Sequence, residues 1–161
     1  MLTVMKFGGN TVATAERVSS TASIIRSYSN NNKLIVVVSA IKGITDELIS
    51  ICDSIKRKDE HLTNTILSNI INKHKDIVNN LRLQESNREE LSSVIDALTN
   101  ELSSVIKGLL LIKEVTPRSM DYILSFGERF IAPILCYALR DIGVKAEYMS
   151  GKDAGIVTDS T

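Results

Sequence analysis

Residues 1–13, MLTVMKFGGNTVA, decide the fold class of this chain. The segment LTVMKF has the β-branched and apolar mix of a short strand, and the glycine pair ends it. A helix is expected over residues 14–27, with Thr14 as its N-cap. The run KLIVVVSA at 33–40 is typical of a strand that is covered on both faces of a parallel sheet. Strand, helix and strand at this length predict one βαβ unit.

Composition indicates a folded protein with a small ligand. The 161 residues suffice for one domain or a piece of a larger one, with 43% hydrophobic and 24% charged residues. The 19 basic residues balance 19 acidic ones, which argues against nucleic acid or an anionic membrane as partner. No apolar run approaches a membrane span and no signal peptide is recognisable, so a cytoplasmic protein is expected. Cys52 and Cys136 are expected to be core residues rather than a disulfide or metal pair.

A helical excursion is expected over about 45–113. These amphipathic helices need an apolar partner, and packing on the sheet is favoured over a coiled-coil arm for another chain. His61 and His74 lie here and are expected at the surface or the core edge. The apolar residues that define three helices are Ile44, Leu48, Ile51 and Ile55; Leu62, Ile66, Ile70, Ile77 and Leu81; and Leu91, Val94, Leu98, Leu102, Val105 and Leu109.

The last third of the chain is expected to hold two helices and another strand. A Thr-Pro pair starts the first helix, and a glycine stops the second. The expected bounds are 117–122 after the cap Thr116, a longer helix framed by Gly127 and Pro133 and stopped by Gly143, the strand 144–149, and a loop with room for a short strand over 150–161.

The glycine pair after the first strand suggests an anion site. Gly8 and Gly9 can present backbone N–H groups that no Cβ shields, and Lys6 would add a compact positive charge. The positive end of the next helix would add to it. The alternative is a plain turn, with Lys6 as a surface lysine at a strand end.

Two other segments point to the same place. VVVSAIKGITDEL puts Ser39 at the carboxyl end of the second strand and Thr45 at a helix start, where open α/β sheets bind ligands. As an alternative, Ser39 only ends the strand and Thr45 only caps the helix. SFGERFIAPIL puts Glu128 and Arg129 at the start of a helix, either as a structural ion pair or with Glu128 receiving a substrate ammonium.

Together these segments resemble the aspartate kinases of the amino acid kinase family. KFGGNTV is similar to the family's KFGGTSV, VVVSAIKGITDEL to its VVSAMxGVTDxL, and TPRSMDYILSFGER to its TPRxxDxxLSxGER. YMSGKDAGIVTD is similar to the strand and Asp-Ala-Gly-Ile-x-Thr-Asp loop that follow, so the resemblance runs from Lys6 to Asp159. It implies a three-layer αβα sandwich with a mainly parallel sheet, of which residues 1–161 would be the amino-terminal, amino-acid-binding portion.

The resemblance implies phosphorylation of the β-carboxylate of L-aspartate by ATP with Mg²⁺, the first step toward lysine, threonine and methionine. A carboxylate with a pKa of about 4 is ionised at pH 7, so this nucleophile needs no general base. No metal ligand is expected in the chain. The implied roles are charge neutralisation of the phosphoryl group by Lys6, binding of its oxygens by Gly8, Gly9 and Asn10, aspartate contacts by Ser39 and Thr45, binding of the ammonium by Glu128, and support of Glu128 by Arg129.

The chain departs from the family pattern in two ways. Asn10 and Thr11 stand where the family has Thr and Ser, which displaces a hydroxyl. The ATP-binding half and the ACT regulatory domains are absent, so the isolated chain is expected to be inactive. An open sheet edge predicts a homo-oligomer or a second chain that supplies the missing half. The alternatives are a kinase for another amino acid such as glutamate, and a non-catalytic or partner-dependent subunit.

Overall fold

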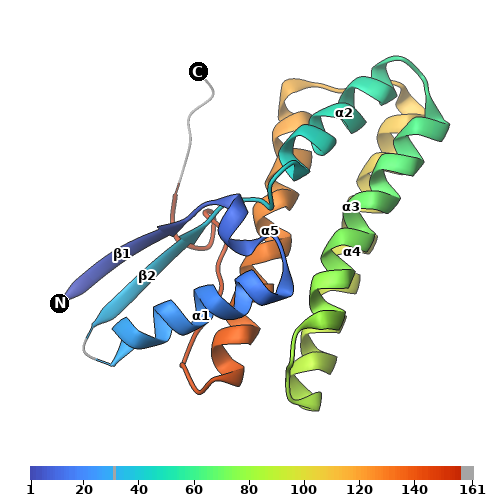
Figure 1. The fold of residues 1–161 in the computed structure, drawn as a ribbon. Helices are drawn as coiled ribbons and strands as arrows, with labels where there is room; N and C mark the ends of the chain where they lie inside the picture. Colours follow the sequence, from blue (N-terminus) through green and yellow to red (C-terminus); the bar gives the residue numbers. More distant parts are fainter. Residues whose placement is uncertain (31, 157–161) are drawn as a thin grey trace.

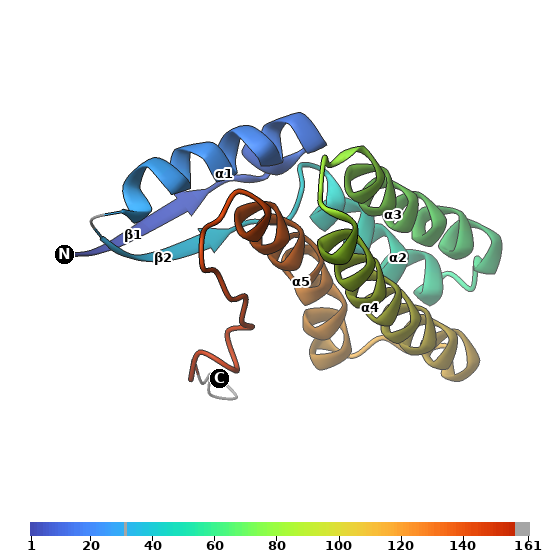
Figure 2. The same ribbon diagram turned by 90° about the horizontal axis from the view of Figure 1, so that it is seen from below.

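The computed structural model describes residues 1–30 and 32–156 (Figure 1). Figures 1 and 2 both show the two strands and α1 on one side of α5, with α2, α3 and α4 on its other side. The elements are β1 (Leu2–Phe7), the 3₁₀ turn η1 (Gly9–Val12), α1 (Ala15–Ser29), β2 (Lys33–Val38), α2 (Ile44–Lys56), α3 (Glu60–Asn80), α4 (Glu85–Ile112) and α5 (Pro117–Asp141).

The predicted βαβ unit is confirmed. β1 and β2 pair in parallel, from Leu2 opposite Lys33 to Phe7 opposite Val38. The Thr14 hydroxyl accepts the N–H of Arg17 at 3.2 Å, which caps α1 as expected. The unit therefore brings the carboxyl ends of both strands to the same edge of the sheet.

Only one face of the strand pair is covered. Phe7, Leu34, Val36 and Val38 pack against the hydrophobic core. The opposite face is 43–63% exposed at Leu2, Val4, Ile35 and Val37. The prediction that β2 is covered on both faces is therefore wrong for the described part of the chain, because its unbroken apolar run fixes the composition of both faces but not their neighbours.

The helical excursion packs around α5 rather than on the sheet. The predicted apolar positions of α2 are all fully buried, and Ile70, Ile77, Leu91 and Leu102 are buried in α3 and α4. Contacts join α2 to α3, α3 to α4, and α2 and α4 to α5. The favoured packing on the sheet is thus wrong, because α5 offers the larger apolar surface: it buries twelve residues between Ile123 and Leu139.

α5 is one helix where the sequence predicts two. Thr116 and Ser119 form a capping box, and Pro133 lies inside the helix without ending it. Burial of the residues around Gly127 outweighs the low helix propensity of glycine. The predicted stop is confirmed: Gly143 has φ +84°, and the N–H of Val144 reaches the Leu139 carbonyl at 3.0 Å.

Residues 144–149 form no strand in the described structure. The side chain of Arg140 donates to the carbonyl of Ala146 at 2.9 Å, so a side chain takes the place of a neighbouring strand there. A turn follows, in which the Ser150 and Asp153 side chains accept each other's N–H. The part of the predicted loop over 157–161 lies outside the described residues.

By length and composition alone α5 could cross a membrane, although Glu128 and Arg129 interrupt its apolar residues. However, 67% of its most apolar window is buried among the other elements. Such burial is typical of a core helix.

His74 is fully buried, so its predicted place at the surface or core edge is wrong. Its ring stacks on Phe130 at 4.6 Å between centroids, and Nδ1 lies 2.7 Å from the carbonyl of Ile70. Burial lowers the pKa of His74 to about 4. By contrast, Cys52 and Cys136 are free and buried, as predicted.

Candidate active site

The loop after β1 and the loop after β2 touch at Gly9. A Cβ on Gly9 would lie 2.3 Å from the carbonyl oxygen of Ala40 and 2.8 Å from the nitrogen of Lys42. The Gly9 carbonyl also accepts the N–H of Lys42 at 3.4 Å. Only glycine permits this approach of backbone to backbone, so Gly9 joins the loop after β1 to the loop after β2.

α5 reaches the same loop through Gly127 and Glu128. A Cβ on Gly127 would lie 2.6 Å from the Cβ of Ala40, so a glycine is needed here as well. The next residue, Glu128, accepts the Ala40 N–H through Oε1 at 3.1 Å. Ala40 is therefore the point at which all three predicted segments meet.

Glu128 lies in the middle of α5, not at a helix start as predicted. Its residue is exposed, although one oxygen is bonded to Ala40. A carboxylate has lone pairs for several donors, so Glu128 can accept a further N–H from a ligand. Its place beside the carboxyl end of β2 is where α/β proteins bind ligands.

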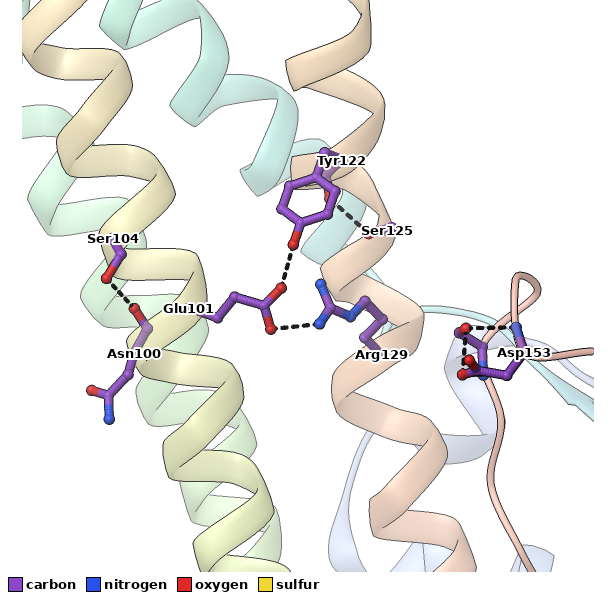
Figure 3. A network of polar contacts seen from close by, with 8 residues as sticks. Asn100, Glu101, Ser104, Tyr122, Ser125, Arg129 and Asp153 are labelled. Atoms are coloured by element: carbon purple, nitrogen blue, oxygen red, sulfur yellow. Dashed lines mark hydrogen bonds and ion pairs between the residues drawn. The ribbon is translucent and has the colours of Figure 1, made fainter. Parts of the chain in front are cut away.

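The side chain of Arg129 contacts Glu101 of α4, so any support of Glu128 by Arg129 passes through the backbone of α5 rather than through a contact between the two side chains (Figure 3). The guanidinium lies 2.6 Å from Glu101 Oε2 and 4.2 Å from the ring centroid of Phe126. The hydroxyl of Tyr122 donates to the other oxygen of Glu101. The hydrogen bond from Arg129 holds the pKa of Glu101 below its usual value. Figure 3 shows the three side chains converging between α4 and α5.

The glycine turn leaves two of its backbone donors without an acceptor inside the turn. The Gly8 carbonyl accepts the N–H and the hydroxyl of Thr11 at 2.9 and 2.7 Å, which closes η1. The N–H groups of Gly9 and Asn10 open this turn and have no acceptor within it. Gly8 has an ordinary φ of −79°, and a Cβ there would meet nothing within 4 Å. The fold thus requires Gly9 but not Gly8.

Asn10 is exposed, and its carbonyl accepts a hydrogen bond from Arg17 at 2.6 Å. The hydroxyl of Thr11 is engaged with Gly8, as described above. The departure from the family pattern therefore leaves the Asn10 amide, rather than a hydroxyl, at the outer side of the turn.

Lys6, Ser39 and Thr45 lie along the same edge. Lys6 is exposed on the open face of the sheet, paired in register with Val37. The N–H of Ser39 donates to the Phe7 carbonyl at 3.1 Å and so continues the ladder toward the loops. Thr45 is exposed in the first turn of α2, which begins after Gly43, so Thr45 is not the N-cap.

The sequence does not indicate two further residues of this region, Lys73 and Glu101, and both come from the helical excursion. Lys73 of α3 donates to the Lys42 carbonyl at 3.0 Å and thereby holds the loop after β2. Glu101 of α4 binds Arg129. Both occupy polar positions of amphipathic helices, and no local pattern separates them from ordinary surface residues.

The chain is similar in sequence and in structure to known aspartokinases. The chain is 33% identical over 160 residues to aspartokinase 3, chloroplastic, of Arabidopsis thaliana. The aligned region covers 96% of the chain and 27% of that protein. Aspartokinase 1, chloroplastic, of the same plant is 32% identical, and the aligned region covers 96% of the chain and 26% of that protein. The crystal structure of E. coli aspartokinase III in complex with aspartate and ADP matches with a TM-score of 0.75 and 27% identity, covering 91% of the chain and 30% of that structure.

The fold is thus an incomplete αβα fold of the amino acid kinase type, as predicted. The chain spans about a quarter of the length of the curated relatives, at 27% and 26%. The family model for the amino acid kinase family matches residues 1–161. The chain therefore belongs to the amino acid kinase family.

Proposed function

We propose that this chain is the amino-acid-binding part of an aspartate kinase, which transfers the γ-phosphoryl group of ATP to the β-carboxylate of L-aspartate. The observation that carries the proposal is the bond between Glu128 and the Ala40 N–H, which holds a carboxylate beside the carboxyl ends of β1 and β2. The similarity to an aspartokinase whose crystal structure contains aspartate and ADP supports it.

The amino acid would be held mainly by polar groups of α2, α5 and the loop that follows β2. Glu128 accepts the substrate ammonium through lone pairs that the Ala40 N–H leaves free. The hydroxyls of Ser39 and Thr45 donate to the substrate carboxylates from either side of the loop after β2. Arg129 of α5 stays paired with Glu101 of α4 and makes no substrate contact.

The glycine turn would receive the phosphoryl group. Lys6 neutralises its negative charge, and the free N–H groups of Gly9 and Asn10 donate to its oxygens, with Gly8 leaving room for close approach. The attacking β-carboxylate is ionised at neutral pH, so the chain has to supply position and charge rather than a base.

Mg²⁺ would accompany the nucleotide rather than be held by this part of the protein. Among residues 1–30 and 32–156, no three His, Cys, Asp or Glu side chains group as a metal site would require. When bound, the ion would neutralise charge between the phosphates.

The nucleotide-binding half and the ACT regulatory domains would belong to a longer polypeptide or to a partner chain. The exposed apolar face at Leu2, Val4, Ile35 and Val37 would pack against that part. We therefore expect the chain alone to be inactive, and to self-associate through this face and the open sheet edge.

Trapping of the acyl phosphate with hydroxylamine tests the proposal. The assay contains MgATP and L-aspartate and compares residues 1–161 with a chain extended by its downstream coding sequence. Aspartyl hydroxamate from the extended chain alone is the expected result. Hydroxamate from L-glutamate but not L-aspartate would reassign the substrate, and no product with any amino acid would contradict a kinase and favour a non-catalytic subunit.

A further inference from the structure

We propose that Glu101 is a positioning residue: by pairing with Arg129 it fixes α5 in the rotation that turns Glu128 toward Ala40. The structural part of this inference stands on the contacts alone. Its consequence for substrate binding rests on the proposed function, in which Glu128 binds the ammonium of aspartate.

α5 is held from two sides at consecutive residues. On the loop side, Gly127 packs against the Cβ of Ala40 and Glu128 accepts the Ala40 N–H. On the α4 side, Arg129 meets Glu101 at 2.6 Å. Neighbouring residues of a helix point in different directions, so these contacts constrain the rotation of α5 rather than only its distance from α4.

The Arg129 guanidinium has a defined place between α4 and α5. It lies 4.2 Å from the ring centroid of Phe126 and 5.7 Å from that of Tyr122. Tyr122 also donates to Glu101, so one carboxylate binds two residues of α5 that are two turns apart. A carboxylate that ties two turns of one helix to its neighbour resists a turn of that helix about its axis.

This ion pair is also the most buried one in the described part of the chain. The side chains of Arg129 and Glu101 are 27% and 37% exposed, whereas those of Lys75 and Asp96 are 44% and 60% exposed. Partial burial reduces screening by solvent, so the pair has more influence on geometry than an ordinary surface pair.

The chain offers a matched control at the same helix interface. Tyr137 of α5 donates to Glu90 Oε2 of α4 at 3.1 Å, about two turns beyond Arg129. Tyr137→Phe removes a contact between α4 and α5 but leaves the ring in place. A general loosening of the interface would follow from either substitution, whereas loss of positioning should follow only from changes at Glu101.

The first test uses amide hydrogen exchange at Ala40 in the 161-residue chain, which needs no activity. Glu128→Ala should speed exchange and so establishes that this amide reports the bond. We expect Glu101→Gln to speed Ala40 exchange about fivefold, the equivalent of roughly 1 kcal/mol, and Tyr137→Phe to leave it unchanged. The charge-swapped double variant E101R/R129E should restore part of the protection that Glu101→Gln loses. If the double variant does not fold, the comparison of Glu101→Gln with Tyr137→Phe still decides the test.

Unchanged Ala40 exchange in Glu101→Gln, or an equal effect of Tyr137→Phe, would overturn the inference.

The second test measures kinetics in the extended, active form. Glu101→Gln should raise the KM for aspartate about fivefold with kcat nearly unchanged, and Tyr137→Phe should change neither. The two tests can also disagree. If Glu101→Gln speeds Ala40 exchange but Glu128→Gln leaves the KM for aspartate unaltered, the proposed function is refuted while the positioning role of Glu101 stands.

Discussion

Glu128 and Ala40, which are 88 positions apart in the sequence, are joined by a hydrogen bond of 3.1 Å from the Ala40 N–H to Oε1. Gly9 and Gly127 both approach the same loop too closely for a Cβ. Three separate segments are therefore held at one place by contacts that only their particular residues allow. These contacts are the basis of the following expectations.

Glu128→Gln should weaken aspartate binding. The amide keeps an acceptor for the Ala40 N–H but loses the charge that attracts the substrate ammonium. We expect the KM for aspartate to rise about 10- to 100-fold with a smaller change in kcat, measured in the extended form. An unaltered KM would remove Glu128 from the binding site.

Lys6→Ala should affect the chemical step instead. Lys6 would act on charge that develops during phosphoryl transfer, so its loss should lower kcat about 100- to 1,000-fold while aspartate binding persists. Steady-state kinetics with varied aspartate separates the two effects. Lys33→Ala is the control, because Lys33 is exposed on the same face at the far end of the strand pair; an equal loss there would indicate a non-specific effect of charge.

The two glycines of the turn should respond differently to alanine. Gly9→Ala would force a Cβ against the backbone of Ala40 and Lys42, and we expect it to lower the free energy of unfolding by about 1–3 kcal/mol. Gly8→Ala meets open space and should leave stability nearly unchanged. Urea denaturation compares the two, and equal stabilities would show that the loops do not touch.

Gly8→Ala further separates fold from function. A role of the Gly8 region in binding phosphate requires close approach of a ligand, which a methyl group hinders. The variant should therefore fold normally but lose activity in the extended form. Full activity of Gly8→Ala would contradict a phosphate contact at this position.

His74 should make stability depend on pH. Its folded pKa of about 4 lies below the unfolded value of 6.5, so between these values the unfolded chain binds more protons. The free energy of unfolding should fall by about 3 kcal/mol as the pH drops from 7 to 4, and the slope that His74 contributes fades as the pH rises above the unfolded value of 6.5.

Replacing the ring tests this assignment. His74→Phe keeps an aromatic ring on Phe130 but cannot be protonated, so the slope between pH 7 and 4 should become shallower. His61→Gln removes an exposed histidine of the same helix and should leave the slope as it is. Equal slopes for His74→Phe and the parent chain would show that another group causes the acid sensitivity.

Local patterns in the sequence predicted much of the secondary structure. The Thr14 cap and the apolar stripe of α2 act within a few residues, and both are confirmed. The prediction failed where tertiary packing decides. Gly127 does not separate two helices, because burial against Ala40 stabilises it inside α5, and residues 144–149 need a pairing strand that the described structure does not provide.

The candidate site shows the same division. The βαβ pattern predicted Gly9 and Ser39 at one edge because parallel strands align their carboxyl ends. The place of Glu128 beside them was implied only by the family resemblance, and its bond to the Ala40 N–H follows from the packing of α5. They did not reveal Lys73 or Glu101, because a polar residue on an amphipathic helix carries no sign of which element faces it. Such partners follow only from the packing of the helical excursion.

The most direct test of the amino-acid site is an amide NMR titration of the 161-residue chain with L-aspartate. We expect progressive shifts at Ser39, Ala40 and Thr45, with a dissociation constant in the millimolar range because only part of the contacts is present, on the order of 4 kcal/mol of binding. N-acetyl-L-aspartate, which lacks the ammonium, should cause no shifts at these positions, and Glu128→Gln should raise the dissociation constant for L-aspartate about 10- to 100-fold. Equal shifts with both ligands, or no shifts at these three amides, would contradict the account.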